Sequence, residues 1–302
     1  MVSRSIHRRG SPIRTKGELA FDTVNVTFMF LIIVVTLYPF WFTIVRSFSQ
    51  VVVGNGITLW PNKFSVSAYS LLFDYDLVWI GYRNTILRCI LGTFLSVFFT
   101  ALTAYPLSKP EMPFQGFLTN FVLITMLFSG GLIPSYILVK DLNMLNSIWS
   151  LVLPGMMGAY NIFIVRNFFR SIPASLEESA RIDGANWFYI WIRIIVPLAK
   201  PVIATITLWS LVGHWNAWFD ALIYIQDNTK TVVQVVLRNV TIENSATDMN
   251  AIMSKMANKN QRPSGKTLEA AMTVVTIVPM LIVYPFLQKY FVKGIMIGSI
   301  KG

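Results

Sequence analysis

Residues 23–45 read TVNVTFMFLIIVVTLYPFWFTIV and contain no Asp, Glu, Lys or Arg. An apolar helix needs about 20 residues to cross a hydrocarbon core of about 30 Å, so this stretch is long enough to span a membrane. It is too long for the apolar core of a signal peptide, which has about 7–15 residues. It also ends in Pro39-Phe40-Trp41, without a small-residue cleavage site. We therefore expect residues 23–45 to be retained as a membrane anchor.

The composition of the whole chain agrees with this interpretation. Of 302 residues, 54% are hydrophobic and 13% are charged, whereas soluble domains carry about 25% charged residues. These values exclude a disordered, collagen-like or disulfide-scaffold protein. The single cysteine, Cys89, excludes an intrachain disulfide and a multi-cysteine metal site. The net charge of +11 does not require nucleic acid as a partner, because basic residues collect beside the cytoplasmic ends of membrane helices.

Six stretches lack Asp, Glu, Lys and Arg and are long enough to span a bilayer: residues 23–45, 89–108, 112–139, 142–165, 201–219 and 270–288. The sequence therefore predicts an all-α polytopic membrane protein with six transmembrane helices. The third stretch is too long for one straight crossing and contains Ser129-Gly130-Gly131 and Pro134. Either the helix kinks or leaves the membrane there, or these residues are simply the Gly and Pro common in membrane helices.

Orientation follows from the basic residues of the loops. If the N-terminus is inside, the loops and termini on the inner side have 74 residues and contain 14 of the 25 Lys and Arg. The loops on the outer side, which include residues 46–88, have 95 residues and contain the other 11. This bias favours cytoplasmic termini. We expect residues 1–22 to form a cytoplasmic segment and residues 23–302 to form one transmembrane domain. Within this domain the inner loop is 166–200, the outer loop is 226–267 and the inner tail is 289–302.

The inner loop contains a helix–turn–helix pattern at residues 172–197. Ser175 and Glu178 fit a capping box at a helix start, and Gly184 can end that helix because glycine tolerates a left-handed turn. A second short helix then carries an apolar face closed by a proline: Trp187, Trp191, Ile194 and Pro197. Two interpretations are open. The element can pass motion between a soluble partner and the membrane, or it can lie on lipid headgroups.

The same residues resemble the signature of ABC importer permeases, which runs Glu-Ala-Ala, three residues, Gly, nine residues, Ile, one residue, Leu-Pro. Five positions match at every spacing: Glu178, Ala180, Gly184, Ile194 and Pro197. Ser179 stands where the signature has its first Ala, and Val196 stands where it has Leu. Asp183 and Ala185 flank the glycine as in carbohydrate-type permeases. Residues 215–219 resemble a Trp-Asn motif of that group, although this chain has Asp220 where a proline is often found close by in the family. Residues 288–302 resemble the C-terminal tail of the family.

This resemblance is to the maltose-permease-like branch that serves complex oligosaccharides, and it implies a bacterial inner-membrane subunit that is not an enzyme. The chain would form half of the pathway with a second homologous permease. Two ATP-binding subunits would dock on the inner loop and bind ATP and Mg, so this chain would need no cofactor. An extracytoplasmic solute-binding protein would deliver the sugar. The coupling residues would be Glu178, Ala180, Asp183, Gly184, Ala185, Ile194 and Pro197, with Glu178 either pairing with a basic ATPase residue or serving as a cap.

Candidate pathway residues are polar or aromatic side chains within the spans: Tyr160, Asn161, Trp209, His214, Trp215 and Asn216. An ionisable residue within a span is by default a functional hypothesis, and aromatic faces with hydrogen-bonding groups suit sugar rings. The alternative for His214 is a hydrogen bond between helices. Because no Arg or Lys lies within the six stretches, the sequence gives no reason to expect an acidic sugar.

The outer loop is long and polar, and in the resembling family such a loop reaches the solute-binding protein. Disorder is the alternative, although residues 231–240 are apolar enough to fold. In the tail, Lys289, Lys293 and Lys301 can contact anionic lipid.

Other function classes find less support in the sequence. An ion-coupled secondary carrier of a polar solute, the alternative function, needs paired acids or matching broken helices in two halves. The six stretches contain no Asp or Glu, and the halves show no repeat. No Ser/His/Asp set or metal cluster suggests a membrane enzyme. Residues 265–267, Gly-Lys-Thr, resemble the end of a phosphate loop, but Asn260 occupies the required glycine position.

Overall fold

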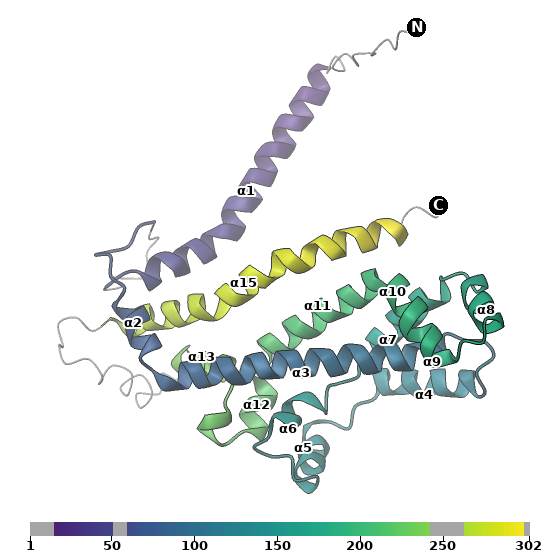
Figure 1. The fold of residues 1–302 in the computed structure, drawn as a ribbon. Helices are drawn as coiled ribbons and strands as arrows, with labels where there is room; N and C mark the ends of the chain where they lie inside the picture. Colours follow the sequence, from purple (N-terminus) through teal and green to yellow (C-terminus); the bar gives the residue numbers. More distant parts are fainter. Residues whose placement is uncertain (1–14, 51–58, 242–262, 299–302) are drawn as a thin grey trace.

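The computed structural model describes residues 15–50, 59–241 and 263–298, and within them the chain is helical (Figure 1). Over these ranges β-structure is limited to one isolated bridge between Ser49 and Phe64. The first helices along the chain are α1 Lys16–Ser47, α2 Ser67–Phe73, α3 Asp76–Leu107 and α4 Gln115–Leu127. Those in the middle are α5 Leu132–Asp141, α6 Ile148–Val152, α7 Ala159–Arg170, α8 Ser175–Ile182, α9 Trp187–Ile190, the π-helix η1 Trp191–Ile195 and α10 Val196–Leu198. The last are α11 Lys200–Asn216, α12 Phe219–Tyr224, the 3₁₀-helix η2 Asn228–Lys230, α13 Val233–Thr241 and α15 Gly265–Gly298.

Helix α3 is the central element of the molecule. It runs from the end that carries α2 and α13 to the end that carries α8 and α9, with α11 and α15 lying roughly along it (Figure 1). Small residues follow each other at about four-residue spacing on its buried face, including Gly81, Thr85, Gly92, Ser96, Thr100 and Ala104. Small side chains let helix backbones approach closely in membrane proteins. A Cβ at Gly81 would lie 3.0 Å from the backbone of Val233 in α13.

The structure extends α3 well beyond the charge-free stretch 89–108. The helix begins at Asp76, so residues 76–88, which we expected to belong to an outer loop, are helical. Arg83 and Arg88 interrupt the charge-free run without interrupting the helix. Arg88 is buried and ion-paired, so its charge is compatible with a helix interior.

Two of the other stretches are bent. Helices α4 and α5 meet at 112°, and Gly131 between them has φ +85°. The kink predicted at residues 129–134 is therefore confirmed. The fourth stretch, 142–165, is not one helix, because α6 ends before Pro154-Gly155 and α7 begins only at Ala159.

The described helices support a polytopic membrane protein but supply fewer long helices than six. Three helices are long and apolar enough to cross a membrane: α1, α3 and α15 as far as Val283. Two more spans result if each bent pair counts as one, namely α4 with α5, and residues 187–198 with α11 at 83°. The predicted fourth span falls short because its polypeptide divides into α6 and α7.

Within the described residues, three apolar clusters hold the bundle together. The largest joins α3, α7, α9, η1 and α11 around Phe169, Ile190, Trp191 and Ile206. A second, at the opposite end of α3, joins α2, α3, α13 and α15. A third joins α5, α6, α12 and α13. The largest cluster lies directly behind α8 and α9 and fixes their position.

A large apolar surface is left uncovered within this chain. The C-terminal part of α1 lies near α15, and α1 diverges from the bundle toward its own N-terminus (Figure 1). Nearly all its side chains are exposed, and α4, which the structure describes in full, contains no buried residue. These faces are suited to lipid or to another membrane subunit.

Candidate functional site

Helix α8 ends in a turn that requires glycine. Gly184 has φ +82°, its N–H donates to the carbonyl of Arg181 at 3.0 Å, and the N–H of Ala185 donates to the carbonyl of Ala180 at 2.9 Å. This pair of bonds is the Schellman arrangement, which satisfies the last carbonyls of a helix. The prediction that Gly184 ends the helix is confirmed. The turn reverses the chain and directs α9 back toward α3.

The start of α8 differs from the prediction. Ala174 is the N-cap residue, with no side-chain cap, so the capping box expected from Ser175 and Glu178 is not formed. The backbone is helical already at Ala174, which places Ser175 inside the helix. Glu177 and Glu178 lie in the first turn, where carboxylates interact favourably with the helix dipole.

The second half of the hairpin is irregular. Asn186 caps α9 by accepting the N–H of Tyr189 at 2.8 Å, and the chain then widens into the π-helix η1 before a short α10. Ile194 packs against the largest apolar cluster. Pro197 lies within α10 and does not end it, because the sharp turn comes at Ala199. Trp191 packs edge-on against Phe98 of α3, with ring centroids 5.7 Å apart.

Glu177 is the acid that the structure buries, and the sequence analysis did not single it out. Its side chain pairs with Lys109 and accepts a hydrogen bond from the hydroxyl of Tyr105 at 3.1 Å. The expected coupling residue Glu178 is exposed. A helical spacing of three places Glu177 on the same face as Ala180, which packs against the largest cluster. That spacing was the signal available in the sequence.

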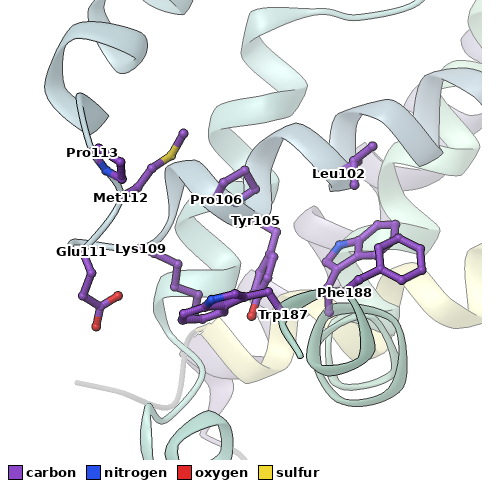
Figure 2. A pocket seen from close by; sticks show the side chains of 10 residues that line it. Leu102, Tyr105, Pro106, Lys109, Glu111, Met112, Pro113, Trp187 and Phe188 are labelled. Atoms are coloured by element: carbon purple, nitrogen blue, oxygen red, sulfur yellow. The ribbon is translucent and has the colours of Figure 1, made fainter. Parts of the chain in front are cut away.

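Two cavities flank the contact between the hairpin and α3. One has a volume of about 430 Å³ and a mostly apolar lining from the end of α3, the segment after it and α9. Figure 2 shows Tyr105 and Leu102 on α3 with Trp187 and Phe188 across the same cavity. The other, about 310 Å³, lies on the α8 side and is lined by Glu177, Glu178 and Arg181 among others. Lys109, Glu111 and Trp187 line both cavities.

A second polar cluster lies where α11 breaks before α12. The guanidinium of Arg88, 2% exposed, pairs with Asp220 through both carboxylate oxygens and donates to the carbonyl of Ala217 at 3.2 Å. Its Nε lies 3.5 Å from Nδ1 of His214. The ring of His214 packs so closely on Gly92 that a Cβ there would overlap it. The expectation that no Arg lies within the spanning helices was therefore wrong.

The candidate pathway residues fall into separate environments. Tyr160 of α7 stacks with Trp209 of α11, with centroids 6.2 Å apart and an interplanar angle of 24°, and both are exposed. Asn161 is half-buried beside Tyr160 and Asn216 is exposed at the end of α11. Trp215 is buried and donates to the carbonyl of Thr276 in α15, while His214 faces α3. Among the six candidates, the structure thus brings the side chains of Tyr160 and Trp209 together.

The opposite end of the molecule carries the loop after α12. Oδ1 of Asn146 accepts the N–H groups of Gln226 and Asp227 at 2.6 and 3.0 Å. Hydrogen bonds from the Thr229 hydroxyl and N–H lower the pKa of Asp227 below its usual value. The expected folding of residues 231–240 is confirmed by α13, whose apolar side enters the second cluster. The rest of the predicted loop, 242–262, lies outside the described residues.

The tail is placed only in part. Helix α15 continues through residues 289–298, so Lys289 and Lys293 lie on a helix. Lys301 lies outside the described residues. The lipid contact expected of these lysines stays a prediction.

Comparison with known proteins gives consistent matches over almost the entire chain. Residues 18–297 match the family described as binding-protein-dependent transport system inner membrane component. The chain is 40% identical to the polygalacturonan/rhamnogalacturonan transport system permease protein YtcP of Bacillus subtilis, covering 93% of this chain and 98% of that protein. It is 39% identical to protein LplC of Bacillus subtilis, covering 95% and 97%.

A solved structure agrees with the fold. A chain from the crystal structure of a bacterial ABC transporter involved in the import of the acidic polysaccharide alginate superposes with a TM-score of 0.84, with 32% identity and coverage of 93% of this chain and 100% of that one. The resemblance to importer permeases is confirmed, and the comparisons give no support to an ion-coupled carrier. The chain belongs to the family of binding-protein-dependent transport system inner membrane components.

Proposed function

We propose that this permease forms half of the pathway of an ABC importer for oligosaccharides derived from acidic polysaccharides. The observation that carries the proposal is the exposed Tyr160–Trp209 stack, which presents two aromatic faces beside Asn161. Such faces fit the apolar sides of sugar rings. YtcP is named for polygalacturonan and rhamnogalacturonan transport, and the structural neighbour is described as involved in the import of the acidic polysaccharide alginate. These names support an acidic rather than a neutral sugar.

Transport in proteoliposomes tests the pathway. The permease is reconstituted with its partner permease, its ATPase subunits and its solute-binding protein, and uptake of labelled oligogalacturonate is compared with uptake of a neutral maltooligosaccharide. Tyr160→Ala and Trp209→Ala should each slow oligogalacturonate uptake about tenfold, the effect of losing one stacking contact. Trp209→Phe should restore part of it. Phe30→Ala, on the exposed part of α1, is the control. Unchanged uptake in both alanine variants would refute the pathway assignment.

The 172–197 hairpin is proposed as the docking element for the ATPase subunits. Its outer surface is uncovered in this chain: Glu178 is exposed, Leu176 is 43% exposed and Ile182 is 87% exposed. An apolar tip exposed beside a glycine turn suits insertion into a groove on a soluble partner. Ala180, Asp183, Gly184 and Ala185 would shape this tip. Ile194 and Pro197 would hold its base against the bundle.

The assembly we propose has a second homologous permease, two ATP-binding subunits that hold ATP and Mg, and an extracytoplasmic solute-binding protein. The apolar faces of α1 and α4 would contact lipid or the second permease. Six spans with both termini in the cytoplasm remain the proposed topology, with α6 and α7 together forming the fourth. Co-purification tests the assembly, because a carrier would be isolated and would function alone.

A further inference from the structure

The contact between α8 and α3 depends on one buried acid. Within α8, which the structure describes in full, Glu177 is the one buried residue, at 5% exposed. Its two oxygens are divided between two partners: one pairs with Lys109 and the other accepts the Tyr105 hydroxyl. A carboxylate buried without such partners would be costly. Glu177 is therefore the point at which α8 is attached to the bundle.

Both partners of Glu177 lie at or just after the C-terminal end of α3. Tyr105 lies in the last turn of that helix and Lys109 follows it by two residues, with its ammonium 4.9 Å from the centre of the Tyr105 ring. The Tyr105 ring also meets Phe169 of α7 and Trp187 of α9 at 6.2 and 6.4 Å. A displacement of Glu177 would act directly on the C-terminal end of α3, the central helix of the bundle.

Cavities of about 430 and 310 Å³ lie on the two sides of this link and share Lys109, Glu111 and Trp187 as lining. Apolar packing transmits a displacement only where atoms are in contact. Within α8 the one side chain that packs against the largest cluster is that of Ala180, so the charged link is the part of the α8–α3 contact best able to carry a directed movement.

We infer that Glu177, with Lys109 and Tyr105, is a positioning group that transmits movement of α8 to α3, a role distinct from that of the exposed Glu178. The inference rests on the proposed function of the hairpin as the ATPase docking element. In this division, Glu178 faces outward toward the docking partner and Glu177 faces inward toward the pathway helices. Loss of Glu177 should leave docking intact and reduce the transport obtained per ATP.

The experiment uses the complete transporter in proteoliposomes, with uptake, ATP hydrolysis and co-purification of all subunits measured together. Glu177→Gln and Tyr105→Phe remove the charge or the hydroxyl with little change in shape. Lys109→Met leaves the acid unpaired, and the reversed pair Glu177→Lys with Lys109→Glu restores opposite charges. Glu178→Gln, on the exposed side of the same turn, is the contrasting variant and should weaken docking of the ATPase subunits.

We expect Glu177→Gln to co-purify normally, retain ATP hydrolysis and lose about tenfold in transport per ATP, the effect of one charge-assisted hydrogen bond. The reversed pair should regain more than half of that loss. Spin labels on residues 102 and 179, in α3 and α8, should show a nucleotide-dependent distance change in the parent protein that diverges in Glu177→Gln. A purely structural role would not produce this divergence.

Two results would overturn the inference: parent-level transport per ATP in Glu177→Gln, or a transport loss that only follows a loss of assembly. Failure of the proposed function is distinguishable from both. In that case the parent complex would neither couple ATP hydrolysis to uptake nor co-purify with ATPase subunits, and Glu178→Gln would have no effect. Coupling that is impaired by Glu178→Gln and unaffected by Glu177→Gln would refute the inference alone.

Discussion

Arg88 illustrates how a single residue can mislead a hydropathy argument. Any arginine interrupts a charge-free stretch, so the second predicted span began only at Cys89. In the structure the guanidinium is neutralised by Asp220, 132 positions away along the chain, and it also satisfies the Ala217 carbonyl at a helix break. No local pattern announces a partner so distant in sequence. The same holds for Glu177, whose burial depends on Lys109.

Removing only one member of the Arg88–Asp220 pair should be more harmful than removing both. Arg88→Met leaves the carboxylate and the Ala217 carbonyl without their donor and should cost about 3 kcal/mol, near the lower end of the range for buried pairs because the Asp220 side chain is 30% exposed. Arg88→Met with Asp220→Leu should recover much of that stability. Thermal unfolding of the purified protein, followed by tryptophan fluorescence, measures both. A double variant no more stable than the single one would contradict the pairing argument.

At the scale of elements, glycine signals were reliable where glycine alone determines the backbone, whereas Pro197 did not end its helix. Gly131 and Gly184 both have positive φ, at a predicted kink and a predicted helix end. The capping box failed because Ser175 is one residue inside the helix. The widening of η1 could not be predicted either, because a π turn depends on packing around Trp191 and Ile195 rather than on residue type.

The α8 turn should tolerate no β-branched residue. Nothing lies within 4 Å of a Cβ at Gly184, so the cost of Gly184→Val comes from the left-handed backbone and is about 1–2 kcal/mol. We expect the variant to reach the membrane with its bundle intact and to hydrolyse ATP without proportionate uptake. Gly184→Asn, which adopts this conformation more readily, should retain more transport. Parent-like coupling in Gly184→Val would count against a role for the turn.

The whole molecule shows what hydropathy can and cannot count. Apolar composition identified the membrane class, and the family-like residues of the hairpin identified the transport class. Composition did not reveal that residues 142–165 divide at Pro154-Gly155, because the breaking residues are uncharged. Nor could it show which aromatic residues meet. The Tyr160–Trp209 stack joins α7 to α11 across the intervening hairpin.

The proposed topology can be tested by cysteine labelling. Cys89 is buried and is the single cysteine of the chain, so Cys89→Ser provides a background for new sites. A cysteine at Ile182, on the α8 tip, should react with an impermeant maleimide only after the membrane is permeabilised. One at Asn228, in η2 beside α12, should react in intact cells. Labelling of both from the same side would contradict the proposed arrangement.

The direction in which the hairpin points also depends on the number of residues between its tip and α11. In η1 the N–H of Val196 reaches back to the carbonyl of Trp191, so this turn holds one residue more than an α-turn. Each residue of an α-helix advances the chain by about 100°. Removing the extra residue of η1 would restore a regular α-turn and leave the flanking faces aligned, whereas a one-residue deletion in the regular helical turn of α9 would rotate everything before it through that angle. The tip at Ile182 would then point elsewhere, although every side chain proposed for docking would still be present.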